Sequence, residues 1–386
     1  MPQVKGLKER IVAGQATKEK MSEYDFFIQW HLTERCNLYC SHCYQGEMKK
    51  NEMSFSELKK VVEEVSDTLK SWAETYGIKF LPSFNVTGGE PFLRKDLFEI
   101  LGEISRKGFG IYLLSNGALI NKQNAERLSA LDVKGVQVSI EGPENVHDKI
   151  RGKGSFALSA KGIKNLLESN IKVTLNVTLS NLNTEHVRDL ISFASSIGAQ
   201  RLGFSRLVPS GRGKNLLNEM LKTKKVKEIY ESLLSADIEG LDIVTGDPVA
   251  AQMDLEINSD TGCTAHGGCA AGISGLTILP DGTMIPCRRL NIPIGNIRQD
   301  SLREVWATSE TLNLLRDKSK YKGKCGRCNR WASCRGCRAI AYAYSQSVEE
   351  NDSNYFEESK KAKKKLEGAK KALADTDSNF ANIDSK

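Results

Sequence analysis

Three cysteines stand close together near the start of the chain, in the stretch Cys36-Asn37-Leu38-Tyr39-Cys40-Ser41-His42-Cys43. Their spacing is C-x3-C-x2-C, and they follow an apolar run over residues 26–32. Three thiolates can ligate three irons of a [4Fe–4S] cluster and leave the fourth iron to a ligand other than protein. Clusters that only carry electrons usually have four cysteine ligands, so this spacing favours chemistry at the iron. A zinc knuckle or buried structural cysteines are the alternatives that the spacing alone leaves open.

A second motif, Gly88-Gly89-Glu90-Pro91, follows an apolar, β-rich run further along the chain. Two glycines let the backbone approach a ligand closely, and Glu90 offers a charge-assisted acceptor. Taken alone, the motif is also compatible with an ordinary turn.

The elements that must position these motifs are strands alternating with helices. Strands are predicted over residues 24–32, 111–114, 135–140, 172–179 and 201–208. A further β-rich run, between the first two of these strands, ends at residue 86. Helices are predicted over 58–72, where Ser54 and Glu57 offer a capping box, and over 95–107, 121–131, 157–169 and 184–197. About six parallel βα units fall short of the eight in a closed barrel, so we predict an α/β fold with a partial (β/α)6 TIM-like barrel. The motifs follow strand ends, where such barrels place their chemistry.

The three-cysteine spacing resembles the signature of radical S-adenosylmethionine (radical SAM) enzymes, C-x3-C-x-aromatic-C, with His42 at the aromatic place. The second motif, residues 88–91, resembles the GGEP element of the same family. The resemblance implies the same partial barrel and an open iron that chelates the amino and carboxylate groups of SAM. One electron from the cluster then cleaves SAM to methionine and a 5′-deoxyadenosyl radical, which abstracts a hydrogen atom from the substrate. Residues 88–91 would hold the methionyl ammonium.

Further segments resemble SAM-contacting parts of the same family. Ser139-Ile140-Glu141-Gly142 and the segment 147–152 resemble S-[IL]-D-G…H-D-x-x-R-G, which implies that Ser139 and Arg151 approach the ribose and carboxylate of SAM. Glu141 stands where Asp is usual, and a turn with a surface arginine is the alternative. Asn116, after the third strand, and Arg206, in a segment resembling the last-strand loop, complete the expected cofactor-binding residues.

Seven further cysteines lie in residues 263–337, around a predicted hairpin that turns on Asp281-Gly282: Cys263, Cys269, Cys287, Cys325, Cys328, Cys334 and Cys337. A structural zinc ribbon over 325–337 would leave three thiols unused. The layout resembles the SPASM domain, which implies a first auxiliary cluster on Cys263, Cys269, Cys287 and Cys337, and a second on Cys325, Cys328 and Cys334. The final SPASM cysteine is absent, and Asp352 and Tyr355 occupy its neighbourhood. Asp352, another oxygen ligand or an open iron are the alternatives for the fourth position of the second cluster.

The resemblance to SPASM enzymes implies hydrogen abstraction followed by a one-electron oxidation. The expected substrate is a peptide or protein that is crosslinked or oxidised at a side chain, and tailoring of a tetrapyrrole or other cofactor is the alternative. A non-catalytic iron–sulfur electron carrier or scaffold is the alternative of another class.

Arg288 and Arg289 follow Cys287, where sulfatase-maturing enzymes carry an Asp base, and two guanidiniums suit binding a carboxylate rather than taking a proton. If both arginines face the cavity, we expect an anionic substrate; the alternative is that they are an ordinary pair of surface residues. The sequence does not indicate an individual catalytic residue.

The whole chain has 386 residues, 40% hydrophobic and 27% charged, as in ordinary globular proteins. We expect a 1–22 extension, a 23–245 barrel, a 246–356 SPASM domain and a 357–386 basic tail. The tail carries part of the net charge of +7, so no nucleic-acid partner is predicted; it is either solvated or a docking arm for an acidic partner. No apolar run suits a membrane span or a secretory signal, which predicts a cytoplasmic enzyme with no membrane partner. A ferredoxin or flavodoxin would supply electrons, and a separate protein would bind any peptide leader, since residues 1–22 are too short to do so.

Overall fold

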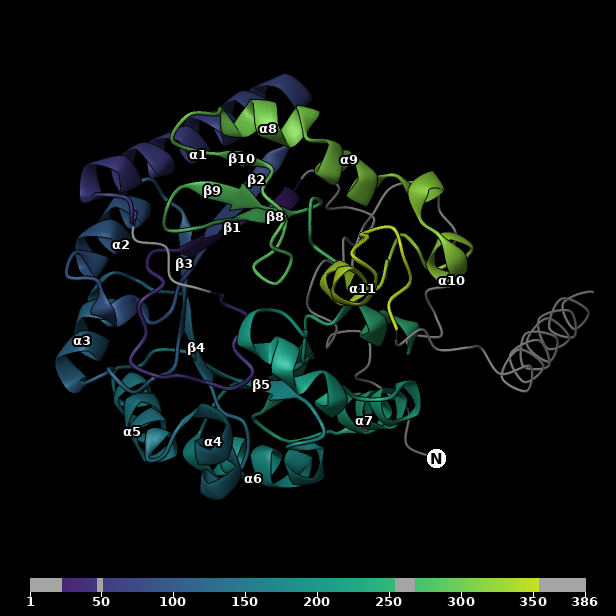
Figure 1. Cartoon of the computed structure of the whole chain (residues 1–386). Coiled ribbons are helices and arrows are strands. Elements are labelled where there is room, and N and C mark those ends of the chain that lie inside the picture. The colour runs from purple at the N-terminus through teal and green to yellow at the C-terminus, as the bar shows by residue number, and fades with distance from the viewer. Residues whose placement is uncertain (1–22, 47–50, 254–267, 354–386) are drawn as a thin grey trace, which may run out of the picture. The chain divides into compact units, whose positions relative to one another are not determined.

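Six parallel strands, paired in the order of the sequence, form the core of the fold (Figure 1). The computed structural model of the chain describes residues 23–46, 51–253 and 268–353. The six strands are β1 (Glu23–His31), β2 (Lys79–Thr87), β3 (Gly110–Ser115), β4 (Gly135–Ser139), β5 (Val173–Leu179) and β6 (Arg201–Arg206). Strand β7 (Asp242–Thr245) pairs in parallel with β6. The predicted α/β fold with a partial barrel is confirmed; the predictions for residues 1–22, Cys263, Tyr355 and the basic tail lie outside the described residues.

Helices cover the outer side of these strands (Figure 1). They are α1 (Phe55–Tyr76), α2 (Leu97–Arg106), α3 (Lys122–Ala130), α4 (Glu144–Arg151), α5 (Ser155–Glu168) and α6 (Val187–Ile197), followed by α7 (Thr223–Ser235). Helix α1 buries Leu58, Val61, Val65, Leu69 and Trp72, the helical spacing that the sequence predicts. Helix α4 is an addition, because the sequence indicated only a motif there.

Strand β1 lies inside the sheet, and this position explains why its sequence is rich in apolar residues. It pairs in parallel with β2 on one side and with β8 (Gly275–Ile278) on the other. Phe26, Ile28 and Trp30 are therefore at most 2% exposed. Strand β8 turns on Asp281-Gly282 into β9 (Thr283–Ile285), as predicted, and β10 (Gly295–Asn296) follows. One sheet thus runs from the barrel into the cysteine-rich segment, while the domain boundaries stay a prediction.

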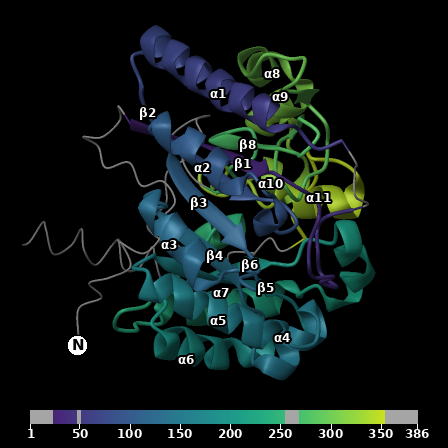
Figure 2. The same ribbon diagram turned by 90° about the vertical axis from the view of Figure 1, so that its left-hand side faces the viewer.

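The C-terminal helices fasten that segment to the barrel. They are α8 (Leu302–Thr308), α9 (Glu310–Arg316), α10 (Gly323–Gly326) and α11 (Arg338–Ser345). Figure 2 shows α8 beside α1. The Trp306 ring lies 5.1 Å from Phe26 and 6.0 Å from Trp72, and Arg298 Nε donates to Glu57 Oε1 at 2.8 Å. None of the described helices is both long and apolar enough to cross a membrane.

The capping box at the start of α1 can be tested directly. Glu57 N donates to Ser54 Oγ at 3.4 Å, and Ser54 N donates to Glu57 Oε2 at 2.7 Å. Ser54→Ala should lower the free energy of unfolding by about 1 kcal/mol, because a helix N–H loses its acceptor. Anaerobic urea denaturation measures this, with Ser66→Ala in the middle of the same helix as the control. Equal losses in both variants would contradict a capping role.

Candidate functional site

The three-cysteine loop leaves β1 at the carboxyl edge of the sheet and is fixed by backbone hydrogen bonds. Ser41 N donates to Ile150 O at 2.9 Å, and Gly213 N donates to Cys43 O at 3.1 Å. Arg212 Nε donates to Cys40 O at 3.0 Å, and its guanidinium lies 3.9 Å from the centre of the Tyr39 ring. Arg212 therefore supports the loop. Cys36, Cys40 and Cys43 are free thiols.

One cavity brings together most of the residues predicted from the sequence. Cys36, Cys40, Cys43, Gly88, Gly89, Asn116, Ser139, Arg151, Arg206, Arg288 and Arg289 all line it. Glu90 and Pro91 do not line it. The sequence-based prediction missed polar residues of the strands that also line it, namely Gln137, Asn176, Thr178 and Ser205. Their signal is the alternation of polar and apolar residues in β5, VTLNVTL, which points polar side chains to one face of the strand.

Gly88 and Gly89 are required by the cysteine loop. A Cβ on Gly88 would lie 2.3 Å from Thr33 O, and one on Gly89 would lie 2.2 Å from Arg35 O. Gly89 N donates to Thr33 O at 2.7 Å, and Glu90 N donates to Arg35 O at 2.8 Å. The glycines thus let the backbone approach the start of the cysteine loop, and this contact holds the loop against the end of β2.

The Glu90 carboxylate is fully buried behind the cavity wall. Asn116 N donates to Glu90 Oε2 at 2.9 Å, and Ser115 Oγ donates to Oε1, also at 2.9 Å. Burial raises the pKa of Glu90 to about 7, although these hydrogen bonds oppose the rise. The Glu90 oxygens thus hold Ser115 and Asn116 in place, and the contact of residues 88–91 with the SAM ammonium stays a prediction. Asn116 Nδ2 in turn donates to Asn37 Oδ1 at 2.8 Å and lies 3.9 Å from Cys36 Sγ.

Glu141 organises the charges on the other side of the cysteine loop. Its Oε1 accepts from Arg151 Nε at 2.9 Å and Nη2 at 2.6 Å, and its Oε2 accepts from Thr178 N at 2.9 Å. His42 Nε2 lies 3.2 Å from the same Oε1. Burial would raise the pKa of Glu141, but Arg151 and His42 hold it well below its usual range. Arg151 is thereby aimed at the cysteine loop, with Nη1 3.8 Å from Cys40 Sγ, and is not a surface arginine.

Arg206 lies in the cavity wall, and its guanidinium is held by two carboxylates. It donates to Asp247 through Nε at 2.6 Å and to Asp352 through Nη1 at 2.9 Å. Two buried carboxylates raise the pKa of Arg206 above its usual value against the effect of burial. Arg206 is thus a fixed part of the cavity wall, and its contribution to SAM binding stays a prediction.

Arg288 and Arg289 line the same cavity as the three cysteines. Arg288 Nη1 donates to Gln29 Oε1 at 3.0 Å, and Arg289 Nη1 donates to Arg206 O at 3.3 Å. The Arg289 Nε is buried without a hydrogen-bond partner in the described structure. Burial, together with the like charge of Arg289, lowers the pKa of Arg288. No ion pair with a described carboxylate neutralises either guanidinium. The two arginines face the cavity rather than the outer surface of the protein.

The remaining cysteines form two neighbourhoods. The charges of Cys325 and Cys328 act on Cys334, whose pKa burial raises to about 12. Burial also raises the pKa of Cys337, with Cys269 among its neighbours, and the Arg289 guanidinium lies close to both Cys287 and Cys337. Cys263 lies outside the described residues, and the division of these cysteines between two auxiliary clusters stays a prediction.

Comparison with known proteins decides the family. Residues 30–194 match the radical SAM superfamily, and residues 269–338 match the SPASM iron-sulfur cluster-binding domain. An AdoMet-dependent heme synthase of Methanosarcina barkeri (strain Fusaro) is 31% identical over 338 residues, covering 82% of this chain and 92% of the relative. The chain is a radical SAM enzyme. Because the chain belongs to this enzyme family, the alternatives of a zinc site and of a non-catalytic electron carrier are excluded.

Two other similarities place this radical SAM enzyme among known ones. The mycofactocin maturase of Mycobacterium tuberculosis (strain H37Rv) is 30% identical over 326 residues, covering 82% of this chain and 78% of the maturase. The crystal structure of Streptococcus suis SuiB bound to S-adenosylmethionine superposes with a TM-score of 0.67 at 16% identity, over 86% of this chain and 76% of SuiB. At that identity the structural likeness concerns the fold.

The radical SAM enzyme uses [4Fe–4S] clusters and S-adenosylmethionine, and the cysteine loop fits such a cluster. Burial raises the pKa of the Cys36 and Cys40 thiols, so iron must displace protons to bind them. N–H groups already face the sulfurs: Leu38 N lies 3.4 Å from Cys36 Sγ, and Arg151 Nη1 approaches Cys40 Sγ. Such donors stabilise thiolates.

The raised pKa of Glu90 has a measurable consequence. The folded enzyme binds a proton at Glu90 between pH 4.5 and about 7 that the unfolded chain releases. Stability relative to Glu90→Gln should therefore fall by up to about 3 kcal/mol as the pH rises through that window, and then level off. Anaerobic denaturation from pH 5 to 8 measures the difference, with the exposed Glu99→Gln as the control. A difference that grows with pH would contradict the burial of a neutral Glu90.

Proposed function

We propose that this radical SAM enzyme oxidatively modifies a carboxylate-bearing peptide or protein, as a crosslink or a side-chain oxidation. The observation that carries the proposal is the Arg288–Arg289 pair, two guanidiniums without a described carboxylate partner in the cavity that also holds Cys36, Cys40 and Cys43. Two neighbouring like charges on half-buried side chains repel each other, and an anion between them removes that repulsion. A substrate carboxylate is the anion that bidentate guanidiniums recognise best.

The chain's own residues have separate tasks in this proposal. Cys36, Cys40 and Cys43 hold the cluster that, with SAM bound, supplies the 5′-deoxyadenosyl radical for hydrogen abstraction. Asn116, Ser139 and Arg151 line the wall where SAM would lie, and Gly88-Gly89 keeps that wall against the cysteine loop. Arg288 and Arg289 hold the substrate carboxylate and so decide which substrate carbon faces the cofactor.

The two cysteine neighbourhoods of the SPASM segment would hold the auxiliary clusters. Cys269, Cys287 and Cys337, with Cys263, would form the first, next to Arg289, and Cys325, Cys328 and Cys334 the second. When bound, these clusters would supply an acceptor for the electron that is left on the substrate after hydrogen abstraction. A ferredoxin- or flavodoxin-type donor would reduce the SAM cluster, and we place the reaction in the reducing cytoplasm, where thiolate-held clusters persist. A separate protein would bind the leader of a peptide substrate.

A second candidate substrate is an iron porphyrin whose propionates the arginine pair would bind. It is supported by the heme synthase of M. barkeri, which this chain matches over 92% of that protein's length. The mycofactocin maturase supports the peptide substrate at nearly the same identity. Both substrates present the carboxylate that the cavity lacks.

The cluster assignment is tested by iron analysis and by SAM cleavage. The reconstituted enzyme should contain about twelve irons and form 5′-deoxyadenosine under reducing conditions. Changing Cys36, Cys40 and Cys43 to Ala should abolish this cleavage and leave about eight irons. Cleavage that survives the triple change, or zinc in place of iron, would refute the assignment.

The arginine pair is tested with substrates whose carboxylates can be blocked. Iron coproporphyrin III and a pool of acidic peptides are each compared with their methyl esters as stimulants of 5′-deoxyadenosine formation. The active class should lose its effect on esterification, and Arg288→Gln or Arg289→Gln should weaken its binding by about 2 kcal/mol, roughly 30-fold. The exposed Arg303→Gln on α8 makes the same change of net charge and serves as the control. Equal stimulation by acid and ester would rule out carboxylate recognition.

A further inference from the structure

Asp352 occupies the neighbourhood in which the SPASM pattern carries its last cysteine, so its contacts decide whether it can replace that ligand. The carboxylate is 2% exposed. Its Oδ1 accepts from Arg206 Nη1 at 2.9 Å, and its Oδ2 accepts from Arg206 Nη2 at 2.7 Å and from Cys337 N at 2.7 Å. Both oxygens are thus committed to hydrogen bonds within the protein.

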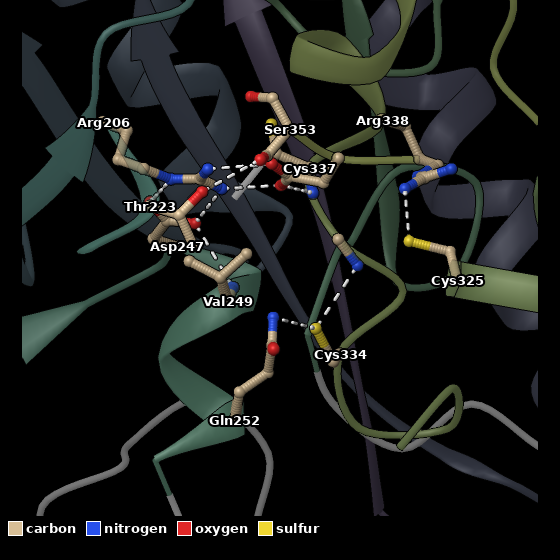
Figure 3. A network of polar contacts seen from close by, with 12 residues as sticks. Arg206, Thr223, Asp247, Val249, Gln252, Cys325, Cys334, Cys337, Arg338 and Ser353 are labelled. Atoms are coloured by element: carbon tan, nitrogen blue, oxygen red, sulfur yellow. Dashed lines mark hydrogen bonds and ion pairs between the residues drawn. The ribbon is translucent and has the colours of Figure 1, made fainter. Parts of the chain in front are cut away.

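The other side of Arg206 is held just as firmly (Figure 3). Asp247 accepts from Arg206 Nε at 2.6 Å and Nη2 at 2.8 Å, and Tyr230 Oη donates to Asp247 Oδ2 at 2.8 Å. Asp247, Arg206 and Asp352 form what we call the Arg206 clamp. It joins the end of β6, the segment after β7 and the segment after α11. Pulling Asp352 towards iron would leave the buried Arg206 with one carboxylate fewer and the Cys337 N–H without its acceptor.

The number of thiols makes this commitment consequential. Two [4Fe–4S] clusters present eight irons, and residues 263–337 supply seven cysteines. One auxiliary iron therefore has no thiolate, wherever Cys263 binds. Resting on the cluster assignment proposed above, we propose that Asp352 is a positioning residue of the Arg206 clamp, and that one iron of the second auxiliary cluster has no ligand among the described residues and is open to an added one.

The surroundings of the second cysteine group suit an external ligand of anionic character. Arg338 Nη2 lies 3.6 Å from Cys325 Sγ, and Arg338 is 1% exposed. Gln252 Nε2 and Gly336 N lie 3.7 Å and 3.3 Å from Cys334 Sγ (Figure 3). These donors offset negative charge at the site, so a thiolate or carboxylate is the class of ligand that it would take.

The clamp also reaches the substrate arginines. The carbonyl oxygen of Arg206 accepts from Arg289 Nη1, while the Arg206 side chain is held by Asp352. Asp352 therefore positions Arg289 through Arg206, and it links the C-terminal segment to the cavity without touching iron.

The test uses the full chain with Cys36, Cys40 and Cys43 changed to Ala, so that only auxiliary clusters remain. In this background Asp352→Asn and Arg206→Gln should each lower Tm while about eight irons and the EPR spectrum of the reduced clusters stay unchanged. Because both residues belong to one clamp, the double variant should lose less Tm than the sum of the two losses. An EPR shift or a loss of iron in Asp352→Asn that Arg206→Gln does not share would show that Asp352 ligates iron.

The open iron is tested with potassium cyanide, without changing residue 352. Cyanide should shift the EPR signal of one auxiliary cluster, because it binds the iron that lacks a protein ligand. An unchanged spectrum would show four protein ligands on every cluster and would overturn the proposal. About four irons, or fewer, in this background would instead overturn the cluster assignment on which the proposal rests.

Discussion

The close approach of two backbones determines the position of the reactive loop. Gly88 and Gly89 lie so near residues 33–35 that a single added Cβ on either would overlap a carbonyl oxygen. Hydrogen bonds from the loop to Ile150, and from Gly213 to the loop, complete its support. Because all of these contacts use the main chain, the side chains of the loop remain available for iron and for the cavity. The loop is thus preorganised by β2, α4 and the segment after β6.

The arginines that line the cavity fall into two groups, those paired with carboxylates and those without such a partner in the described chain. Arg151 has Glu141, and Arg206 has two carboxylates, so both are parts of the framework. Arg288 and Arg289 lie beside each other without such partners in the described chain, and their charge is directed at the cavity. The contrast separates charges that hold the fold from charges that face the cavity, and it is the basis on which an anionic substrate is proposed.

The sequence predicts the strands, most helices and the cysteine groups, because each depends on local patterns. Periodicity locates β5 and α1, and thiol spacing locates the metal sites. Side-chain roles were harder to predict, because they depend on partners distant in sequence. Arg206 meets Asp352 across 146 positions, and Glu90 meets Asn116 through a backbone N–H. Neither contact leaves a local signal, so neither was predicted. The polar residues of the strands had a signal, the period-2 alternation, which would have placed them in the cavity.

The pairing of β8 with β1 has a consequence for biosynthesis. Strand β1 is made first, but its partner on one side, residues 275–278, leaves the ribosome only after the whole barrel has been synthesised. Until then one edge of a nearly continuous apolar strand is unpaired, which is the kind of edge on which chains aggregate. The late contact also makes the topology strongly non-local, and such topologies fold slowly. The nascent barrel therefore depends on its C-terminal hairpin for completion, and a chain stopped before residue 275 would present an open sheet edge to chaperones and proteases.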